Sequence, residues 1–188
     1  MTPAIAYFVS PHGFGHAARS VAVMEALRAL RPDTRIEIFT TVPAWFFEDS
    51  GLSPITLHPV LTDVGLVQTS SLEEDPAATA RALADFLPFT DGRVTRLAET
   101  VEAAGCRLLV TDISPLGPAV AARAGIPGVL VESFTWDWIY RGYGVTSTAS
   151  RLSPGFCLCS KSASTPPPSG SRPIPAANRL PKPPGSAR

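Results

Sequence analysis

Two hydrophobic patterns alternate along residues 4–132. Short continuous apolar runs are typical of strands buried on both faces of a parallel sheet, and between them apolar residues recur at helical spacing. The runs predict strands at residues 4–9, 35–40, 55–60, 108–112 and 128–131. The helical spacing predicts helices from the His16 region to Arg31 and at residues 43–48, 76–87, 91–104 and 115–124, with Pro88 separating two helices or kinking one.

The regular order of strands and helices predicts an α/β fold with a doubly wound parallel sheet. Strand–helix–strand crossovers are almost always right-handed, and the simplest order of the five strands is then 3-2-1-4-5. Pro59 lies within the third strand and lacks a backbone N–H group, which favours an edge position for that strand. Residues 63–70 fit neither pattern and are interpreted as a functional loop.

Composition divides the chain into two parts. Its 188 residues, 45% of them hydrophobic, suffice for one core and are too few for two full-sized domains. The formal net charge of +0 separates into −6 for residues 1–144 and +6 for residues 145–188, where nine of the 20 prolines also lie. We therefore expect a folded domain at 1–144 and a disordered Pro/Ser-rich tail at 145–188. Because the change is abrupt, the tail is also interpreted as the product of a reading-frame error, which would make the chain truncated.

Several classes of protein are not expected. No apolar run reaches the roughly 18 residues of a transmembrane helix, and the N-terminus lacks the basic region of a signal peptide, so a cytoplasmic protein is predicted. Three cysteines, Cys106, Cys157 and Cys159, do not complete a metal site or a disulfide framework, and neither a metal nor another cofactor is expected. The acidic body argues against a nucleic-acid partner.

Candidate chemistry gathers where strands 1 and 4 end. In an open parallel sheet ligands bind beyond the carboxyl ends of the strands, near the point where the strand order reverses. Here the first strand ends in residues 12–16, His-Gly-Phe-Gly-His, and the fourth ends in Asp112. His16 falls in the first turn of a helix, where the helix dipole favours the neutral imidazole that a general base requires. Asp112 is the candidate that fixes its tautomer. The alternatives are that His16 bonds a nearby carbonyl and that Asp112 caps the helix beginning near Pro115.

Other residues are candidates for substrate binding. Gly13 and Gly15 would let a ligand approach the backbone, and Arg19, one turn after His16, would meet an anionic group. The loop lacks the third glycine of a dinucleotide site and the lysine of a phosphate-binding loop. His12, Gln68, Trp136 and Asp137 complete the set of candidates. The alternatives are that His12 only lines the loop, that Gln68 belongs to a simple connection, and that the tryptophans of residues 136–138 pack a final helix into the core.

At these residues the sequence resembles a known family. The segment Ser-Pro-His-Gly-Phe-Gly-His at residues 10–16 resembles the first loop of GT-B glycosyltransferases, particularly the family 28 and UDP-glycosyltransferase-like groups. The resemblance continues through residues 109–113, 124–127 and 134–140. The chain is also similar to the glycosyltransferase-like N-terminal domain of L-arabinokinases, where residues 63–68 and the Trp-Asp run have counterparts. Residues 4–144 are covered.

The resemblance implies a glycosyl-transfer reaction and a second domain that this sequence does not include. In the family, the residue at the position of His16 deprotonates an acceptor hydroxyl, and Asp112 occupies the place of its partner. The implied reaction transfers a hexosyl group, with inversion and without an obligatory metal, from a UDP- or dTDP-sugar to a small-molecule or lipid acceptor. GT-B enzymes hold the nucleotide sugar mainly in a second Rossmann-like domain, and this sequence ends after the first. The alternative function is a non-catalytic sugar- or nucleotide-binding regulatory domain, as in L-arabinokinase-type sugar kinases, and a fragment without function is a third possibility.

Overall fold

The computed structural model describes residues 3–89 and 92–145. All the described residues belong to one unit, Met1–Leu158. The predicted tail and the reading-frame hypothesis concern residues that lie outside the described ones, apart from Val145.

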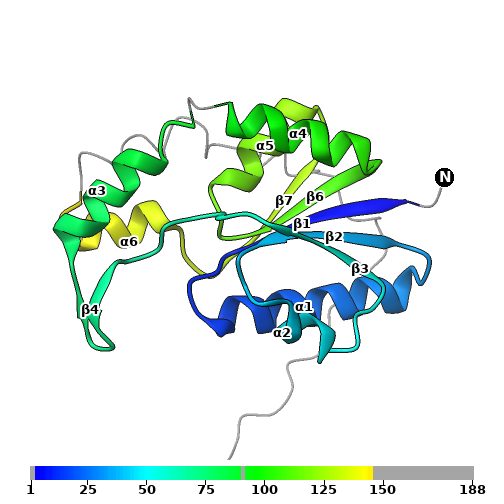
Figure 1. The fold of residues 1–188 in the computed structure, drawn as a ribbon, viewed down its shortest axis with the longest axis horizontal. Coiled ribbons are helices and arrows are strands. Elements are labelled where there is room, and N and C mark those ends of the chain that lie inside the picture. The colour runs from blue at the N-terminus through cyan, green and yellow to red at the C-terminus, as the bar shows by residue number, and fades with distance from the viewer. Residues whose placement is uncertain (1–2, 90–91, 146–188) are drawn as a thin grey trace, which may run out of the picture. The chain divides into compact units, whose positions relative to one another are not determined.

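A parallel sheet forms the centre of the described unit (Figure 1). Its strands are β1 (Ala4–Val9), β2 (Arg35–Thr40), β3 (Ile55–Pro59), β6 (Cys106–Asp112) and β7 (Gly128–Val131), in the order β3-β2-β1-β6-β7. This is the predicted order, with β3 at an edge, so the predicted α/β fold class is confirmed. The order reverses between β1 and β6, which are paired so that Val9 lies opposite Asp112.

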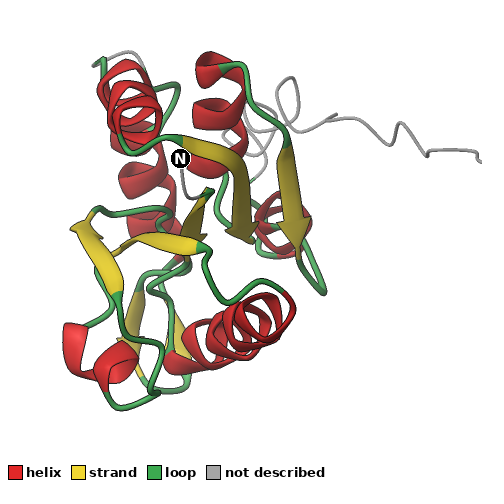
Figure 2. Ribbon diagram, turned by 90° about the vertical axis from the view of Figure 1, so that its right-hand side faces the viewer, coloured by secondary structure: helices red, strands yellow, loops and turns green. Residues whose placement is uncertain are grey.

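Helices cover both faces of this sheet (Figures 1 and 2). The helices α1 (Phe14–Leu30) and α2 (Ala44–Glu48) pack on one face, while α3 (Pro76–Phe86), α4 (Arg93–Ala103), α5 (Leu116–Ala124) and α6 (Trp136–Gly142) share the core of the other. Alternate residues of β1 point to opposite faces, so that Tyr7 packs with Met24 of α1 and Phe8 belongs to the core of α3 to α6. Pro88 separates two helices, which settles that alternative in favour of a break.

Local sequence explains where individual elements begin and how they pack. Helix α3 begins after Asp75, whose carboxylate accepts a hydrogen bond from the backbone N–H of Ala78 at 2.8 Å, and Pro76 occupies the first turn. Helix α5 lies close to β6 because residue 117 is glycine. A Cβ atom there would stand 2.6 Å from Oγ1 of Thr111, well inside van der Waals contact.

One small element was not predicted. The strands β4 (Gln68–Ser70) and β5 (Glu73–Glu74) form an antiparallel hairpin in the region without a clear pattern. Residues 68–73 are exposed, so no buried face imposes the alternation by which strands are recognised. Among the described helices, none has the length and apolar character needed to cross a membrane.

Candidate functional site

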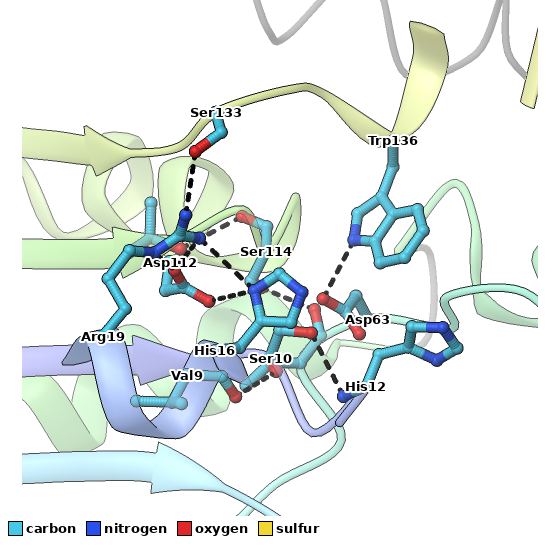
Figure 3. Close-up of polar contacts among 12 residues, drawn as sticks. Val9, Ser10, His12, His16, Arg19, Asp63, Asp112, Ser114, Ser133 and Trp136 are labelled. Carbon is cyan, nitrogen blue, oxygen red and sulfur yellow. Dashed lines mark hydrogen bonds and ion pairs between the residues drawn. The ribbon is translucent and has the colours of Figure 1, made fainter. Parts of the chain in front are cut away.

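The carboxyl ends of β1 and β6 bring three predicted residues together (Figure 3). Asp112, at the end of β6, is completely buried. Its Oδ2 lies 2.7 Å from Nδ1 of His16, and its Oδ1 accepts a hydrogen bond from Nε of Arg19 at 2.7 Å and another from Nη2. His16 and Arg19 stand one turn apart on α1, so a single helix face presents both side chains to the strand end.

Asp112 determines which nitrogen of His16 carries the proton. An ionised carboxylate only accepts hydrogen bonds, so the 2.7 Å contact favours the tautomer of neutral imidazole with its proton on Nδ1. Nη2 of Arg19, which is a donor, lies farther from the same nitrogen, at 3.3 Å, and also bonds Oδ1 of Asp112. In this tautomer the lone pair lies on Nε2. Neither capping alternative is adopted: the His16 ring bonds a carboxylate, and the backbone N–H of Leu116 at the start of α5 donates to the hydroxyl of Ser114, at 3.3 Å, rather than to Asp112.

Arg19 compensates the charge of Asp112. Besides its contacts with that carboxylate, its Nη1 donates to the hydroxyl of Ser133 at 3.2 Å, which ties the segment after β7 to helix α1. A buried carboxylate is costly unless it is paired and hydrogen-bonded, and Arg19 and His16 together satisfy both of its oxygens. The anionic group that Arg19 meets in the structure therefore belongs to the protein itself.

A second buried carboxyl group, which the sequence did not single out, lies beside this cluster. Asp63 is 1% exposed, and its Oδ2 accepts a hydrogen bond from Nε1 of Trp136 at 3.1 Å. Burial raises the pKa of Asp63 to about 6, while the Ser10 hydroxyl, the Trp136 N–H group and His16 favour the ionised form and limit the rise. The available signal was an aspartate closely following the third strand, at the edge of the sheet where ligands bind.

The segment that carries Asp63 is fixed at the strand ends. The Thr62 hydroxyl donates to the carbonyl of Val9 at 2.8 Å, and the Thr62 carbonyl accepts from the hydroxyl of Ser114 at 2.6 Å. The segment following β3 is therefore tied both to the end of β1 and to the loop after β6, and it brings a carboxyl group beside His16 and Asp112.

His12 lies on the other side of Asp63 from His16 in Figure 3. Its ring meets Trp136 in an edge contact, with ring centroids 5.2 Å apart. Burial lowers the pKa of His12, and the neighbouring His16 adds to this effect. Gly65 makes room for the ring: its φ is +64°, and a Cβ atom there would stand 2.3 Å from Nδ1 of His12.

The other predicted residues occupy varied positions. Gly13, at φ +88°, precedes α1, and Gly15 lies in its first turn with open space where a side chain would project, so the backbone there is approachable. Trp136 is buried and stacks on Tyr140. Gln68 is exposed on β4, and Asp137 is paired with Arg141 at 2.9 Å, so neither joins the cluster around His16.

Exposed aromatic rings next to α1 were also missed. Phe14 and Trp45 are each 52% exposed, and Phe14 stacks on Phe46 with ring centroids 5.2 Å apart. Phe14 begins α1, close in sequence to His16, whereas Trp45 and Phe46 belong to α2. Such rings offer an apolar face to a ligand or to another surface. Among residues 3–89 and 92–145, no group of three or more His, Cys, Asp or Glu side chains is suited to hold a metal ion.

Comparison with known proteins places this geometry in context. No protein-family model matches the chain. An L-arabinokinase from Arabidopsis thaliana is 33% identical over 140 residues, which make up 73% of this chain and 13% of that protein. The calicheamicin glycosyltransferase aligns with a TM-score of 0.51 and 17% identity, covering 81% of this chain and 41% of the other. The glycosyltransferase of kitacinnamycin aligns with a TM-score of 0.50 and 17% identity, covering 82% and 37%.

These comparisons identify the fold of the described unit, but they do not assign the activity of a whole relative to this chain. The sequence spans only 13% of the curated relative and less than half of each of these glycosyltransferases, so the activities of the whole proteins belong to them. The described unit has the Rossmann-like fold found in part of GT-B glycosyltransferases, and its sequence is similar to part of an L-arabinokinase.

Proposed function

We propose that this domain is the acceptor-binding half of an inverting glycosyltransferase, with His16 as the general base and Asp112 as the residue that orients it. One observation carries the proposal: Nδ1 of His16 lies 2.7 Å from a completely buried carboxylate at the point where the strand order reverses. This contact leaves Nε2 as a proton acceptor.

The proposed reaction follows from the tautomer. An alcohol is a poor nucleophile, so Nε2 of His16 takes the hydroxyl proton while the oxygen attacks the anomeric carbon of a UDP- or dTDP-sugar. The new carbon–oxygen bond forms as the bond to the nucleoside diphosphate breaks, and the diphosphate departs from the opposite face. Asp112 stabilises the imidazolium that results. A positioned base of this kind contributes about 10²- to 10⁴-fold to the rate.

The partners belong to the same proposal. The acceptor is a small molecule or a lipid, and a second Rossmann-like domain holds the donor, as the resemblance implies. The cytoplasmic location expected from the sequence and the truncation of the chain both stay predictions.

A non-catalytic ligand-binding domain of a sugar kinase is the second candidate. The 33% identity to part of an L-arabinokinase favours it. The pairing of Asp112 with Arg19 favours it as well, because a carboxylate already neutralised by a guanidinium stabilises an imidazolium less. The two candidates differ in whether His16 moves a proton or only binds a ligand.

Release of nucleoside diphosphate distinguishes them. UDP- and dTDP-sugars with mixed acceptors are incubated with the 188-residue chain and with a longer protein completed by any second domain encoded downstream. We expect release by the longer protein, lowered about 10²- to 10⁴-fold by His16→Ala. His58→Ala is the matched control, because His58 contacts Glu37 on β2, away from this cluster. Full activity of His16→Ala would contradict the proposal, and ligand binding without release by either protein would favour the kinase-type domain.

A further inference from the structure

The Asp63 carboxyl group flanks the imidazole of the proposed base. In Figure 3 the His16 ring lies between Asp112 on one side and Asp63 on the other, and the charges of both residues influence Asp63. Because Nδ1 faces Asp112, the Nε2 side of the ring is the side turned toward Asp63. The hydrogen bonds of Thr62 fix the backbone immediately before Asp63, so this relation is built into the fold.

One oxygen of Asp63 has no partner. Oδ2 accepts the Trp136 N–H group, whereas Oδ1 is buried and accepts no hydrogen bond from the described residues. The Ser10 hydroxyl lies near the carboxyl group and favours its ionised form, but no hydrogen bond of ordinary length joins it to Oδ1. A buried carboxylate oxygen without a donor is uncommon in folded proteins and calls for an explanation. The hydrogen bond that anchors α6 through Trp136 accounts for the burial of Oδ2 but not for that of Oδ1.

Because Asp63 is buried, a ligand reaches that oxygen only if a neighbouring side chain moves, and the ring of His12 lies beside it. The backbone N–H of His12 donates to the Ser10 hydroxyl at 3.2 Å, which fixes the main chain, while its ring makes no hydrogen bond within the described part of the chain. The ring rests against Trp136 and over Gly65, contacts that rotation about its side-chain bonds releases without breaking a hydrogen bond.

The acceptor atoms of His16 and Asp63 select the chemistry of the ligand. Nε2 of neutral His16 and Oδ1 of ionised Asp63 are both acceptors, so each requires a donor. An anionic ligand would face the carboxylate, and the guanidinium of Arg19 is already bound to Asp112. Neighbouring hydroxyl groups on an uncharged molecule satisfy both acceptors together.

We propose that Asp63 is a ligand-binding residue whose Oδ1 accepts a hydrogen bond from the hydroxyl next to the one that His16 binds, so that the site takes a vicinal diol of the kind borne by a pyranose ring. This inference rests on the proposed function, since it names the acceptor class of the same site. It makes Asp63 the residue that distinguishes a sugar acceptor from a simple alcohol.

Calorimetric titration of the 188-residue chain with methyl pyranosides, and with singly deoxygenated counterparts, tests the assignment. We expect the parent sugar to bind and Asp63→Asn to weaken binding about 10- to 100-fold, because the amide still accepts from Trp136 but presents N–H groups where Oδ1 stood. Removal of one hydroxyl of the diol should weaken binding to the wild-type chain by a similar factor and to Asp63→Asn much less.

Two control variants separate ligand binding from support of α6. Asp75→Asn makes the same chemical exchange at the start of α3, where asparagine caps a helix as well as aspartate does, and binding should be unchanged. Tyr140→Phe removes a different hydrogen bond that anchors α6, from the Tyr140 hydroxyl to the carbonyl of Gly65 at 3.2 Å, and leaves Asp63 intact, so binding should stay within about threefold of wild type. If Tyr140→Phe binds as weakly as Asp63→Asn, Asp63 acts through α6 and the inference is wrong.

Further outcomes separate this inference from the proposed function. Equal affinity of wild type and Asp63→Asn, or no binding of any pyranoside to the wild-type chain, overturns the inference even where the longer protein shows transfer that depends on His16. Conversely, binding that depends on Asp63, together with unchanged diphosphate release by His16→Ala, overturns the proposed function and leaves the diol site in place.

Discussion

Ionisation of Asp63 should lower the stability of the folded chain, and Asp63→Asn should remove that effect. The ordinary pKa of the carboxyl is 3.8, and burial raises it to about 6 in the folded protein. At about 1.36 kcal/mol per pH unit, this difference corresponds to roughly 3 kcal/mol. The cause is the transfer of a charge from water into a buried site, which the donors Ser10 and Trp136 offset only in part.

The direction of the pH dependence follows from proton binding. Below about pH 4 both the folded and the unfolded chain hold the proton, and the stability that comes from a buried neutral Asp63 is complete. Between about pH 4 and 6 the unfolded chain loses its proton first, so the free energy of unfolding falls as the pH rises. Above about pH 6 both states are ionised and the loss is complete.

Urea unfolding of wild type and Asp63→Asn between pH 4 and 7.5, followed by tryptophan fluorescence, measures the effect. Groups common to both proteins cancel in the difference of their free energies of unfolding. That difference should shift in favour of Asp63→Asn by up to about 3 kcal/mol as the pH rises. A difference that stays constant across this range would refute the reasoning, whatever its size, because a constant offset reflects packing and not ionisation.

Further predictions concern the charge cluster, the packing of α5 and the start of α3. Asp112→Asn removes the anion that Arg19 and His16 share, and the chain should lose about 2–4 kcal/mol in urea unfolding at pH 7; a loss below about 1 kcal/mol would show that solvent screens the cluster. Gly117→Ala should destabilise by about 1–3 kcal/mol through overlap with β6, whereas Gly142→Ala, which meets no atom, should be neutral or slightly stabilising; equal melting temperatures would contradict this. Asp75→Ala should cost about 1 kcal/mol by loss of the α3 cap, and an unchanged melting temperature would show that the cap contributes little.

The strand order was predictable because each signal was local or followed from chirality. Continuous apolar runs identified the buried strands, the helical spacing between them required parallel crossovers, and handedness restricted the order. Pro59 placed β3 at the edge, as observed. The β4–β5 hairpin was not predicted, because its residues are exposed and no buried face imposes an alternating pattern of apolar and polar residues.

The part of the site that could be predicted from the sequence is the part that lies at the ends of the strands. The meeting of His16 and Asp112 follows from the ends of β1 and β6, which lie next to each other in a sheet of this order. The roles of Arg19 and Asp63 depend on side-chain geometry instead. Helical spacing places Arg19 beside His16 but does not say that its guanidinium turns to Asp112. Asp63 reaches the crevice only because hydrogen bonds of Thr62 hold a loop across the strand ends, and such contacts leave no periodic trace.

Strand β3 bears on how the domain behaves beside other copies of itself. An edge strand presents unpaired backbone groups that can recruit a strand from a second molecule. Here prolines stand at both ends of the strand, Pro54 just before it and Pro59 as its last residue, and neither carries an N–H group. An incoming strand therefore finds only a short stretch of donors. This edge of the sheet is therefore protected by its own sequence against the addition of a strand from a second molecule.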